Sequence, residues 1–330
     1  MLRDVMPHFE LYQPDSLEGA LELAERLGPD AWLVAGGQDT YDWLKNRTRR
    51  VAALIDLTGI EALKGVRERE DGGLEIGALT TLTQLERDPL VRERFGLLAA
   101  AAGRVAAPQI RNVGTLGGNL CQDTRCWYYR GGVDCYRAGG NMCYADTPQG
   151  QNREHAIFGA SRCVAVSPSD TAPAVVALDA AMVVHGPRGE RVIPAQRFFV
   201  GPAKNIRRMT VLAPGEILTA VRLPAAWAGA RFYFEKVADR QVWDFALLSV
   251  AAALRMEGDV IRDARIVCGA VECVPRRLQE VERALIGQVR SEELAASAGE
   301  LAVEGARPLN FNHFKMPLMA NLVRRAIREA

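Results

Sequence analysis

Four cysteines lie close together in one stretch rich in glycine and tyrosine, and their thiols are well suited to bind a metal. They follow one another at intervals of nine, eight and twenty positions: Cys126, Cys135, Cys143 and Cys163. A glycine turn, GTLGGN, precedes them at residues 114–119. Thiolates bind metals, and glycine turns present backbone N–H groups to anions such as phosphate. The two features together predict a protein that transfers electrons.

The spacing of these cysteines bears on the kind of metal centre. Four thiolates can hold either zinc or an iron–sulfur cluster. Structural zinc sites usually contain two cysteines separated by roughly two to four residues, and no two of the four are that close. The wide intervals favour a larger inorganic core reached by several loops. Spacing alone leaves zinc and buried free thiols open as alternatives.

The other three cysteines are weaker candidates. Cys268 and Cys273 lie in an apolar strand and turn, ARIVCGAVECVP, where we expect them in the core. Cys121 directly follows the glycine turn and is a fifth candidate ligand. It ranks behind Cys126, which lies inside the aromatic, glycine-rich loop.

A second pair of adjacent glycines, Gly36 and Gly37, follows the apolar segment AWLVA at residues 31–35. Adjacent glycines allow positive φ and let backbone N–H groups approach an anion without a Cβ in the way. Two such turns suit a diphosphate held from two sides. Neither turn matches the G-x-G-x-x-G fingerprint or a G-K-[ST] loop, so a Rossmann or P-loop nucleotide site is disfavoured.

Charged and hydroxyl side chains give no hydrolase pattern. The four histidines do not cluster in sequence with acids or nucleophiles, and no H-E-x-x-H motif occurs. We therefore assign no catalytic residue. Lys236 and Arg240 are candidates to contact a phosphate or a flavin ring, but as single residues both are expected to be solvated. Asp170 is expected to cap the helix that follows it.

The bulk composition excludes several classes of protein. The chain has 330 residues, of which 48% are hydrophobic, and this length predicts about two domains. A net charge of +1 creates no field that would attract nucleic acid or an anionic membrane, so we expect neither as a partner. No apolar run reaches the roughly 18 residues that span a bilayer, so we expect no membrane span.

The N-terminal sequence has neither a long apolar core nor a small-residue cleavage site, so we expect no signal peptide. The protein is expected in the cytoplasm, or in the periplasm if a partner subunit carries an export signal. In such a chain, clustered cysteines indicate metal or redox chemistry rather than disulfides.

The elements that must position these residues can be read from hydrophobic periodicity. The first part predicts a strand at residues 9–14, a helix over 17–28 capped by Ser16, and buried strands at 31–37 and 51–60. From about residue 116 to 161 the chain has no regular periodicity. A stretch this long inside a compact domain needs a special reason, and a bound metal centre is one.

Regular structure is predicted again from residue 163. A strand at 163–166 precedes a helix and a hairpin through Gly186-Pro187. Beyond residues 225–232, strands alternate with polar turns, and three amphipathic helical runs follow Leu278. This order predicts a large α+β domain followed by a smaller α+β domain.

Two motifs carry a family resemblance that covers nearly the whole chain. The first loop, Ala35–Asp39, matches A-G-G-[TQ]-x, and the second, QIRNVGTLGGNL at 109–120, matches Q-[IV]-R-N-x-G-T-[IL]-G-G-N-[IL]. Both are similar to the FAD-gripping loops of the FAD-binding subunit of the molybdenum hydroxylases, the xanthine oxidase family. The family's A-S-P-x-S-D segment corresponds to residues 166–170, which the cysteine-rich stretch displaces. A modest departure is that Tyr41 and Asp42 replace the usual leucine and apolar residue.

The cysteine-rich insert resembles one found in two subgroups of this family, the β subunit of 4-hydroxybenzoyl-CoA reductase and the flavin subunit of bacterial periplasmic aldehyde oxidoreductases. Residues 125–130 and 152–157 are most similar to the aldehyde oxidoreductase type. The resemblance implies a [4Fe–4S] cluster held by Cys126, Cys135, Cys143 and Cys163, with Cys121 at a non-ligand position. It favours an iron–sulfur cluster over zinc.

The resemblance also implies which residues contact FAD, with Asp170 meeting hydroxyl groups of the ribityl chain or the adenosine. The implied cofactor contacts are Leu33, Val34, Ala35, Gly36, Gly37, Gln38, Asp39, Thr40, Val105, Thr115, Leu116, Gly117, Gly118, Asn119, Asp170, Leu218 and Lys236.

The fold implied by the resemblance is α+β. It comprises a two-lobed FAD-binding domain of the PCMH/VAO type at 1–225, with the cluster insert at about 121–165. A small C-terminal α+β domain of the CO dehydrogenase flavoprotein type follows at 226–330.

The implied partners are a large subunit with molybdopterin cytosine dinucleotide and a small [2Fe–2S] subunit. Electrons would pass from substrate at molybdenum, through [2Fe–2S] and FAD, to an external acceptor. Aldehydes are the first expected substrate class, and aromatic acyl-CoA thioesters or N-heterocycles come next. A stand-alone FAD-dependent reductase and a zinc-stapled scaffold without redox function are the alternatives.

Overall fold

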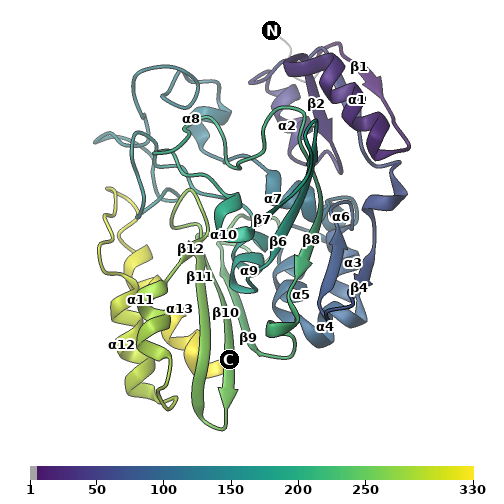
Figure 1. Cartoon of the computed structure of the whole chain (residues 1–330). Coiled ribbons are helices and arrows are strands. Elements are labelled where there is room, and N and C mark those ends of the chain that lie inside the picture. The colour runs from purple at the N-terminus through teal and green to yellow at the C-terminus, as the bar shows by residue number, and fades with distance from the viewer. Residues whose placement is uncertain (1–5) are drawn as a thin grey trace.

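The computed structural model describes residues 6–330, and in them the strands form three separate sheets (Figure 1). Helices lie beside each sheet, as the predicted α+β class requires. Short 3₁₀ segments join some of the elements at Gly28–Asp30, Glu61–Leu63 and Ala225–Trp227. The first two sheets and the third sheet belong to successive parts of the chain.

The first sheet is small and parallel, and its central positions are buried. Its strands lie in the order β1 (Glu10–Tyr12), β3 (Ala53–Asp56) and β2 (Ala31–Val34). Helix α1 (Leu17–Leu27) packs against it, and the Ser16 hydroxyl accepts a hydrogen bond from the Gly19 N–H, which confirms the predicted cap. Strand β2 leads directly into the first glycine loop and then into α2 (Thr40–Lys45).

The second sheet is antiparallel, and the largest core lies against it. Its strands lie in the order β4 (Val66–Glu68), β5 (Leu74–Gly77), β8 (Ile217–Leu223), β6 (Ala181–Gly186) and β7 (Gly189–Pro194). The longer helices around it are α3 (Leu82–Arg87), α4 (Pro89–Arg94), α5 (Gly96–Gly103) and α9 (Thr171–Ala177). Shorter ones are α6 (Pro108–Arg111), α7 (Leu116–Cys121) and α10 (Ala195–Phe198). The predicted hairpin through Gly186-Pro187 is the β6–β7 turn.

The third sheet forms the C-terminal domain and has two buried faces. Its strands lie in the order β12 (Arg276–Arg277), β11 (Val260–Gly269), β10 (Leu248–Glu257) and β9 (Arg231–Val237). Successive side chains of a strand point to opposite faces. Accordingly, Ala251 and Ala253 join the core of the first domain, whereas Val250 and Ala252 face the helices. Those helices are the three predicted amphipathic runs, α11 (Gln279–Leu285), α12 (Glu292–Ala302) and α13 (Lys315–Glu329).

The cysteine-rich stretch is irregular, as predicted. Between residues 122 and 170, all of which the structure describes, α8 (Trp127–Arg130) is the one helix. In Figure 1 these teal loops lie above the C-terminal domain. They are tied to both sides: the Thr48 hydroxyl donates to the Arg130 carbonyl at 3.0 Å, and the Asn310 amide donates to the Pro148 carbonyl at 3.0 Å.

The strand predicted at 163–166 is wrong. This segment is buried, but no strand forms there. Its polar backbone is satisfied singly instead: the Val164 carbonyl accepts from the Ala156 N–H at 2.8 Å, and the Ser167 N–H donates to the Glu272 carbonyl at 3.1 Å. The apolar residues at 163–166 therefore indicate that the segment is buried, and they do not indicate a strand paired with a neighbour.

None of the helices in residues 6–330 is both long enough and apolar enough to cross a membrane.

Candidate functional site

A cavity of about 750 Å³ is bounded by the first sheet, the second sheet and strand β9. Its volume is within the range of roughly 300–1,000 Å³ that is typical of small-molecule sites. Most of the cofactor contacts expected from the sequence line it: Leu33, Ala35, Gly36, Gly37, Gln38, Asp39, Thr40, Val105, Thr115, Gly117, Gly118, Asn119, Asp170, Leu218 and Lys236. Segments far apart in the sequence thus converge on one cavity.

Two expected contacts, Val34 and Leu116, do not line the cavity. The side chain of Val34 packs beside Leu44 and Leu54 under the first sheet. The side chain of Leu116 is fully buried in the large core. Each side chain packs into a core and so anchors the glycine loop at its position in the chain, Val34 the first loop and Leu116 the second.

The first glycine loop is shaped for close approach. Gly37 has a φ of +72°, which favours glycine, and a Cβ on Gly36 would lie 2.1 Å from the Val113 carbonyl oxygen. Within the described part of the chain, the backbone N–H groups of Gly36, Gly37 and Gln38 donate no hydrogen bond. These donors are available to an anion in the cavity.

Most N–H groups of the second glycine loop already donate hydrogen bonds within the protein. The Leu116 and Gly117 N–H groups donate to the Thr80 and Ala78 carbonyls at 2.9 and 2.8 Å. The Gly118 N–H donates to the Thr115 hydroxyl at 3.1 Å. A Cβ on Gly117 would lie 2.8 Å from the Cβ of Ala78. The two loops therefore differ, because the second packs its backbone closely against residues 78–80 and two of its N–H groups are engaged there rather than open to a ligand.

Asp170 and Lys236 form a buried ion pair in the cavity wall. The Lys236 ammonium lies 2.6 Å from Asp170 Oδ2 and also donates to the Arg104 carbonyl at 3.1 Å. Both side chains are 4% exposed. Burial raises the pKa of the Asp170 carboxyl to about 6, and the charge of Lys236 opposes that shift.

This pair corrects two expectations. The Asp170 side chain does not cap α9, because it pairs with Lys236 instead. Lys236 is not a solvated charge, whereas Arg240 is exposed and pairs with Asp244. A single sequence gives no sign of this contact, which joins a loop and a strand 66 positions apart.

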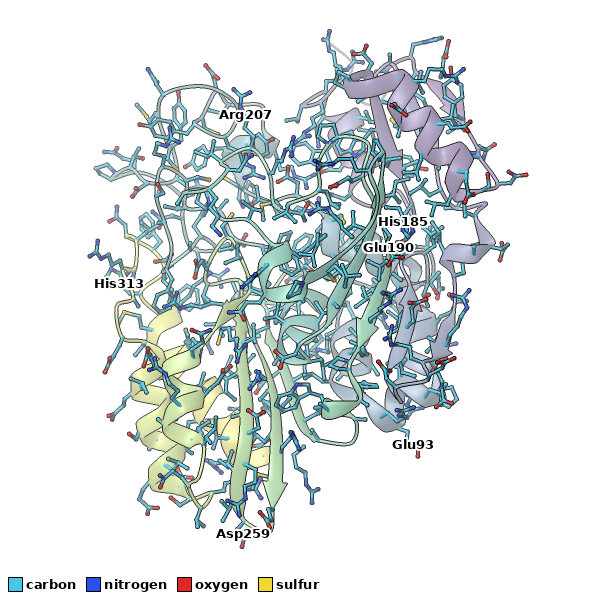
Figure 2. All side chains as sticks on the ribbon, in the orientation of Figure 1. Glu93, His185, Glu190, Arg207, Asp259 and His313 are labelled. Atoms are coloured by element: carbon cyan, nitrogen blue, oxygen red, sulfur yellow. The ribbon has the colours of Figure 1, made fainter. Side chains whose placement is uncertain are left out.

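The cavity also has lining residues that sequence reasoning missed, and three of them are Arg207, Arg208 and Trp243. Arg207 and Arg208 line the cavity and add positive charge to it, and Figure 2 labels Arg207 in the upper part of the molecule. Trp243 also lines it, is 60% exposed and has a φ of +76°, which is rare for a large side chain. The two arginines lie in an unremarkable loop, so no local pattern marked them.

The four candidate cluster cysteines gather in the irregular loops. Burial raises the pKa of the Cys126 thiol to about 11; the Tyr129 and Tyr128 N–H groups oppose this rise, and the charges of Cys163 and Cys143 add to it. The pKa of Cys163 is likewise raised by burial, opposed by the Ala165 N–H, and Cys143 and Cys135 act on it in turn. Neighbouring candidate cysteines thus act on the pKa values of Cys126 and Cys163, and both of these thiols accept backbone hydrogen bonds.

Within residues 6–330, no three or more histidine, cysteine, aspartate or glutamate side chains form a group that could hold a metal ion. The chemistry of the donors still fits an iron–sulfur cluster, because cluster sulfurs are held by cysteine thiolates and tuned by hydrogen bonds of this kind. The His155 Nε2 atom lies 3.2 Å from the Cys126 sulfur and adds a further polar neighbour.

The remaining cysteines lie apart from this group or behind it. Cys268 and Cys273 are buried, as predicted, and Cys273 packs beside Cys163 and Met209. Cys121 ends α7 and lines the cavity, where burial raises the pKa of its thiol to about 12.

One trio resembles a hydrolase arrangement but cannot act as one. His185 Nδ1 lies 2.9 Å from the Thr219 hydroxyl, and His185 Nε2 lies 3.5 Å from Glu190. Figure 2 shows His185 and Glu190 together, with His313 far away on the other side of the molecule. The buried Thr219 hydroxyl donates to the Val183 carbonyl at 3.1 Å, so no free nucleophile results.

Comparison with known proteins places this arrangement in a family. The family model for the FAD binding domain in molybdopterin dehydrogenase matches residues 7–226, and the model for the CO dehydrogenase flavoprotein C-terminal domain matches residues 233–330. The aldehyde oxidoreductase FAD-binding subunit PaoB of Escherichia coli K12 is 34% identical over 95% of each chain. The carbon monoxide dehydrogenase medium chain of Hydrogenophaga pseudoflava is 30% identical over 99% of this chain and 98% of its own.

Solved structures agree with the sequence matches. Carbon monoxide dehydrogenase from H. pseudoflava superposes with a TM-score of 0.78 at 28% identity, and quinoline 2-oxidoreductase from Pseudomonas putida 86 superposes with a TM-score of 0.77 at 27% identity. In each case 99% of this chain and 98% of the other are covered.

The fold and the cavity thus define an oxidoreductase subunit built to bind a dinucleotide. The chain belongs to the FAD-binding medium subunits of the xanthine oxidase and CO dehydrogenase family. The predicted succession of an FAD-binding domain and a CO-dehydrogenase-type C-terminal domain is confirmed.

Proposed function

We infer that this chain is the FAD-carrying electron-transfer subunit of a heteromeric molybdenum hydroxylase and that it also holds a [4Fe–4S] cluster. The observation that carries the FAD assignment is the convergence of both glycine loops and the buried Asp170–Lys236 pair on one cavity of about 750 Å³. FAD, when bound, exchanges electrons with donors and acceptors, while the protein binds and orients it.

Different groups of the protein suit different parts of FAD. The open N–H groups of the first loop suit the FAD diphosphate, and Arg207 and Arg208 add positive charge to the wall of the same cavity. Asp170, held by Lys236, suits a hydroxyl group of the ribityl chain or the adenosine. The apolar side chains of Leu33, Val105 and Leu218 exclude water from the ligand.

The iron–sulfur assignment rests on Cys126, Cys135, Cys143 and Cys163. Four thiolates around one zinc lie only about 3.8 Å apart, at Zn–S distances of about 2.3 Å. A [4Fe–4S] cluster is wider and suits thiols that come from separate loops, and Cys126 packs against both the buried group that contains Cys163 and the one that contains Cys135. The proposed cluster and the FAD cavity are adjacent in sequence, because Arg125 lines the cavity and the next residue is the proposed ligand Cys126.

The substrate and partners follow from the relatives. The E. coli relative is named as an aldehyde oxidoreductase subunit, and its match over 95% of both chains supports aldehydes as the substrate class. The H. pseudoflava relative is named as a medium chain, which supports a large molybdenum-cofactor partner and a small [2Fe–2S] partner. We place the complex in the cytoplasm, or in the periplasm with a signal-bearing partner, and its acceptor outside this chain.

The experiment is an anaerobic titration of the purified chain and its copurifying subunits. Addition of an aldehyde should bleach the flavin absorption, and an N-heterocycle should leave it unchanged. An aromatic acyl-CoA thioester would be reduced by a complex of the reductase type, so it is added to the chemically reduced complex, whose flavin it should not reoxidise. Bleaching by the N-heterocycle alone, or reoxidation by the thioester, would reassign the substrate. Turnover by the isolated chain without partners would instead support a stand-alone reductase, and one zinc with no colour would support a scaffold.

A further inference from the structure

We propose that Arg130, assisted by Arg125, is a positioning residue of the FAD site: it neutralises Asp39 and fixes the first glycine loop. The cysteine-rich insert is then a structural part of the flavin site as well as the proposed carrier of a cluster. This inference rests on the proposed binding of FAD in the cavity.

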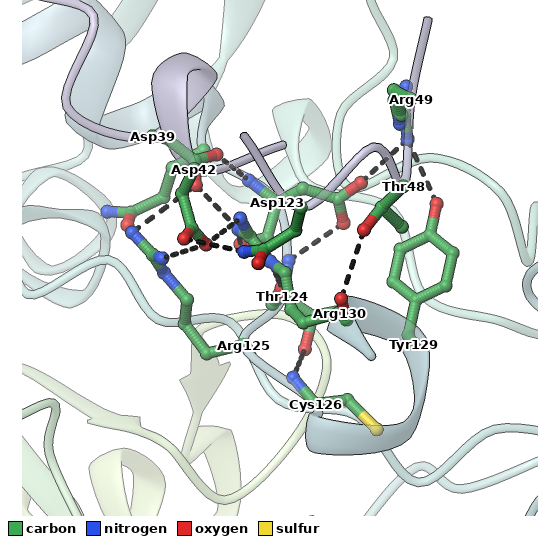
Figure 3. Close-up of polar contacts among 12 residues, drawn as sticks. Asp39, Asp42, Thr48, Arg49, Asp123, Thr124, Arg125, Cys126, Tyr129 and Arg130 are labelled. Atoms are coloured by element: carbon green, nitrogen blue, oxygen red, sulfur yellow. Dashed lines mark hydrogen bonds and ion pairs between the residues drawn. The ribbon is translucent and has the colours of Figure 1, made fainter. Parts of the chain in front are cut away.

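Asp39 lies in the first glycine loop, lines the cavity, and gives both of its carboxylate oxygens to the insert (Figure 3). Its Oδ1 accepts from Arg130 Nη2 at 2.5 Å and lies 3.3 Å from Arg125 Nη2. Its Oδ2 accepts from the Asp123 backbone N–H at 3.0 Å. The loop is therefore fastened by three groups that all lie within residues 123–130.

Arg130 is itself held in a fixed position. Its side chain is 9% exposed, and its Nε donates to the Thr124 carbonyl at 2.8 Å. Its guanidinium lies 3.6 Å from the centre of the Trp43 ring, and its Nη1 donates to Asp42 at 3.1 Å. Because Trp43 and Asp42 belong to α2, one arginine joins α8 of the insert to the loop and to the helix that follows it.

The charge of Asp39 explains why this contact matters for binding. A carboxylate beside a diphosphate repels it, and an aspartate in a phosphate loop is tolerated when a cation neutralises it. Arg130 and Arg125 supply that positive charge through their contacts with Asp39 Oδ1. Asp42 pairs with the same two arginines. The two carboxylates of the loop and α2 are therefore balanced by the two guanidinium groups of the insert.

The test measures the dissociation constant of FAD on the deflavinated full chain with its copurifying subunits, and iron content on the same samples. Arg130→Gln should weaken FAD binding about tenfold, as expected for a lost charge-assisted hydrogen bond, with iron unchanged. Adding Asp39→Asn should recover most of that loss, because the repelling charge is gone. A purely structural role of Arg130 would not be rescued in this way.

The matched control is Arg153→Gln, which breaks an exposed ion pair between the insert and Asp239 and should leave FAD affinity unchanged. If Arg130→Gln does not fold, Arg125→Gln takes its place, since that side chain is 27% exposed. Wild-type affinity in the arginine variant, or no recovery in the double variant, overturns the inference. A wild-type chain that binds no FAD overturns the proposed function instead.

Discussion

Asp170 and Lys236 place two opposite charges in the wall of the cavity with almost no access to water. Such a pair is weak support for stability in itself, yet removing one partner strands the other in a nonpolar environment. A variant that removes one charge and a variant that removes both should therefore differ in stability, although both alter the polar groups that line the cavity.

Lys236→Met should lower the free energy of unfolding by about 3–5 kcal/mol, because it leaves the Asp170 carboxylate buried without its cation. Combining it with Asp170→Asn should restore most of that stability, since no buried charge remains. Both variants should bind FAD more weakly than the wild type. Urea unfolding and FAD titration measure the two effects, and a double variant no more stable than the single one would contradict this account.

Lys315 gives a pH-dependent prediction at the same scale. Its fully buried ammonium donates to the carbonyls of Glu154, His155 and Ala270 at 3.1, 2.9 and 2.7 Å. Burial lowers its pKa from about 10.5 to about 7. The unfolded chain therefore holds this proton more tightly than the folded protein between these two values.

Because the unfolded chain binds this proton more tightly, the contribution of Lys315 to the free energy of unfolding should rise as the pH rises from about 7 to about 10. We expect the wild type to gain stability over that range relative to Lys315→Met, in which no such group titrates. Urea unfolding at several pH values provides the measurement. Parallel profiles for the two proteins would show that the lysine keeps its ordinary pKa.

At the scale of the elements, the two glycine loops depend on close contact between segments. A Cβ on Gly36 would overlap the Val113 carbonyl, so Gly36→Ala should push the two loops apart at a cost of about 1–3 kcal/mol. FAD affinity should fall accordingly. Gly96→Ala is the control, because its Cβ would meet nothing closer than 3.9 Å. Equal FAD affinity in both variants would exclude the close approach as a requirement.

The insert and α2 should loosen together when the proposed cluster is lost. Cys135 is buried against Trp43 of α2 and Tyr129 of α8. We expect Cys135→Ser to speed amide hydrogen exchange in α2 and to remove iron. Cys268→Ser, in the C-terminal core, should leave both unchanged. Unaltered exchange in α2 would mean that the insert does not support this helix.

Local patterns predicted the elements well where one segment decides its own structure. The Ser16 cap and the Gly186-Pro187 hairpin depend on neighbouring residues, and both formed as expected. The run at 163–166 misled because an apolar stretch indicates burial and does not reveal whether a partner strand lies alongside. In the second loop, N–H groups donate to the carbonyls of residues 78 and 80, far back in the chain, whereas within the described residues those of the first loop meet no such carbonyl. A local sequence pattern cannot predict which distant carbonyls a loop will meet.

At the scale of the whole molecule, the third sheet explains how the two domains stay together. Its strands bury Ala251, Ala253 and Val267 against the first domain, and Val250, Ala252 and Ile266 against the three C-terminal helices. The insert spans the same junction, since the Ile157 N–H donates to the Val271 carbonyl at 2.9 Å and Lys315 holds residues 154–155. The sequence predicted the order of the domains; the contacts between them, such as Lys315 with the insert, join positions 160 or more residues apart.

The most direct test of the central claim is a count of FAD and iron in the full chain purified with its partners, compared with Cys135→Ser to subtract iron held elsewhere. The account predicts one FAD per chain and a difference of four iron atoms, as a [4Fe–4S] cluster requires. No FAD, or equal iron in the two proteins, would contradict it.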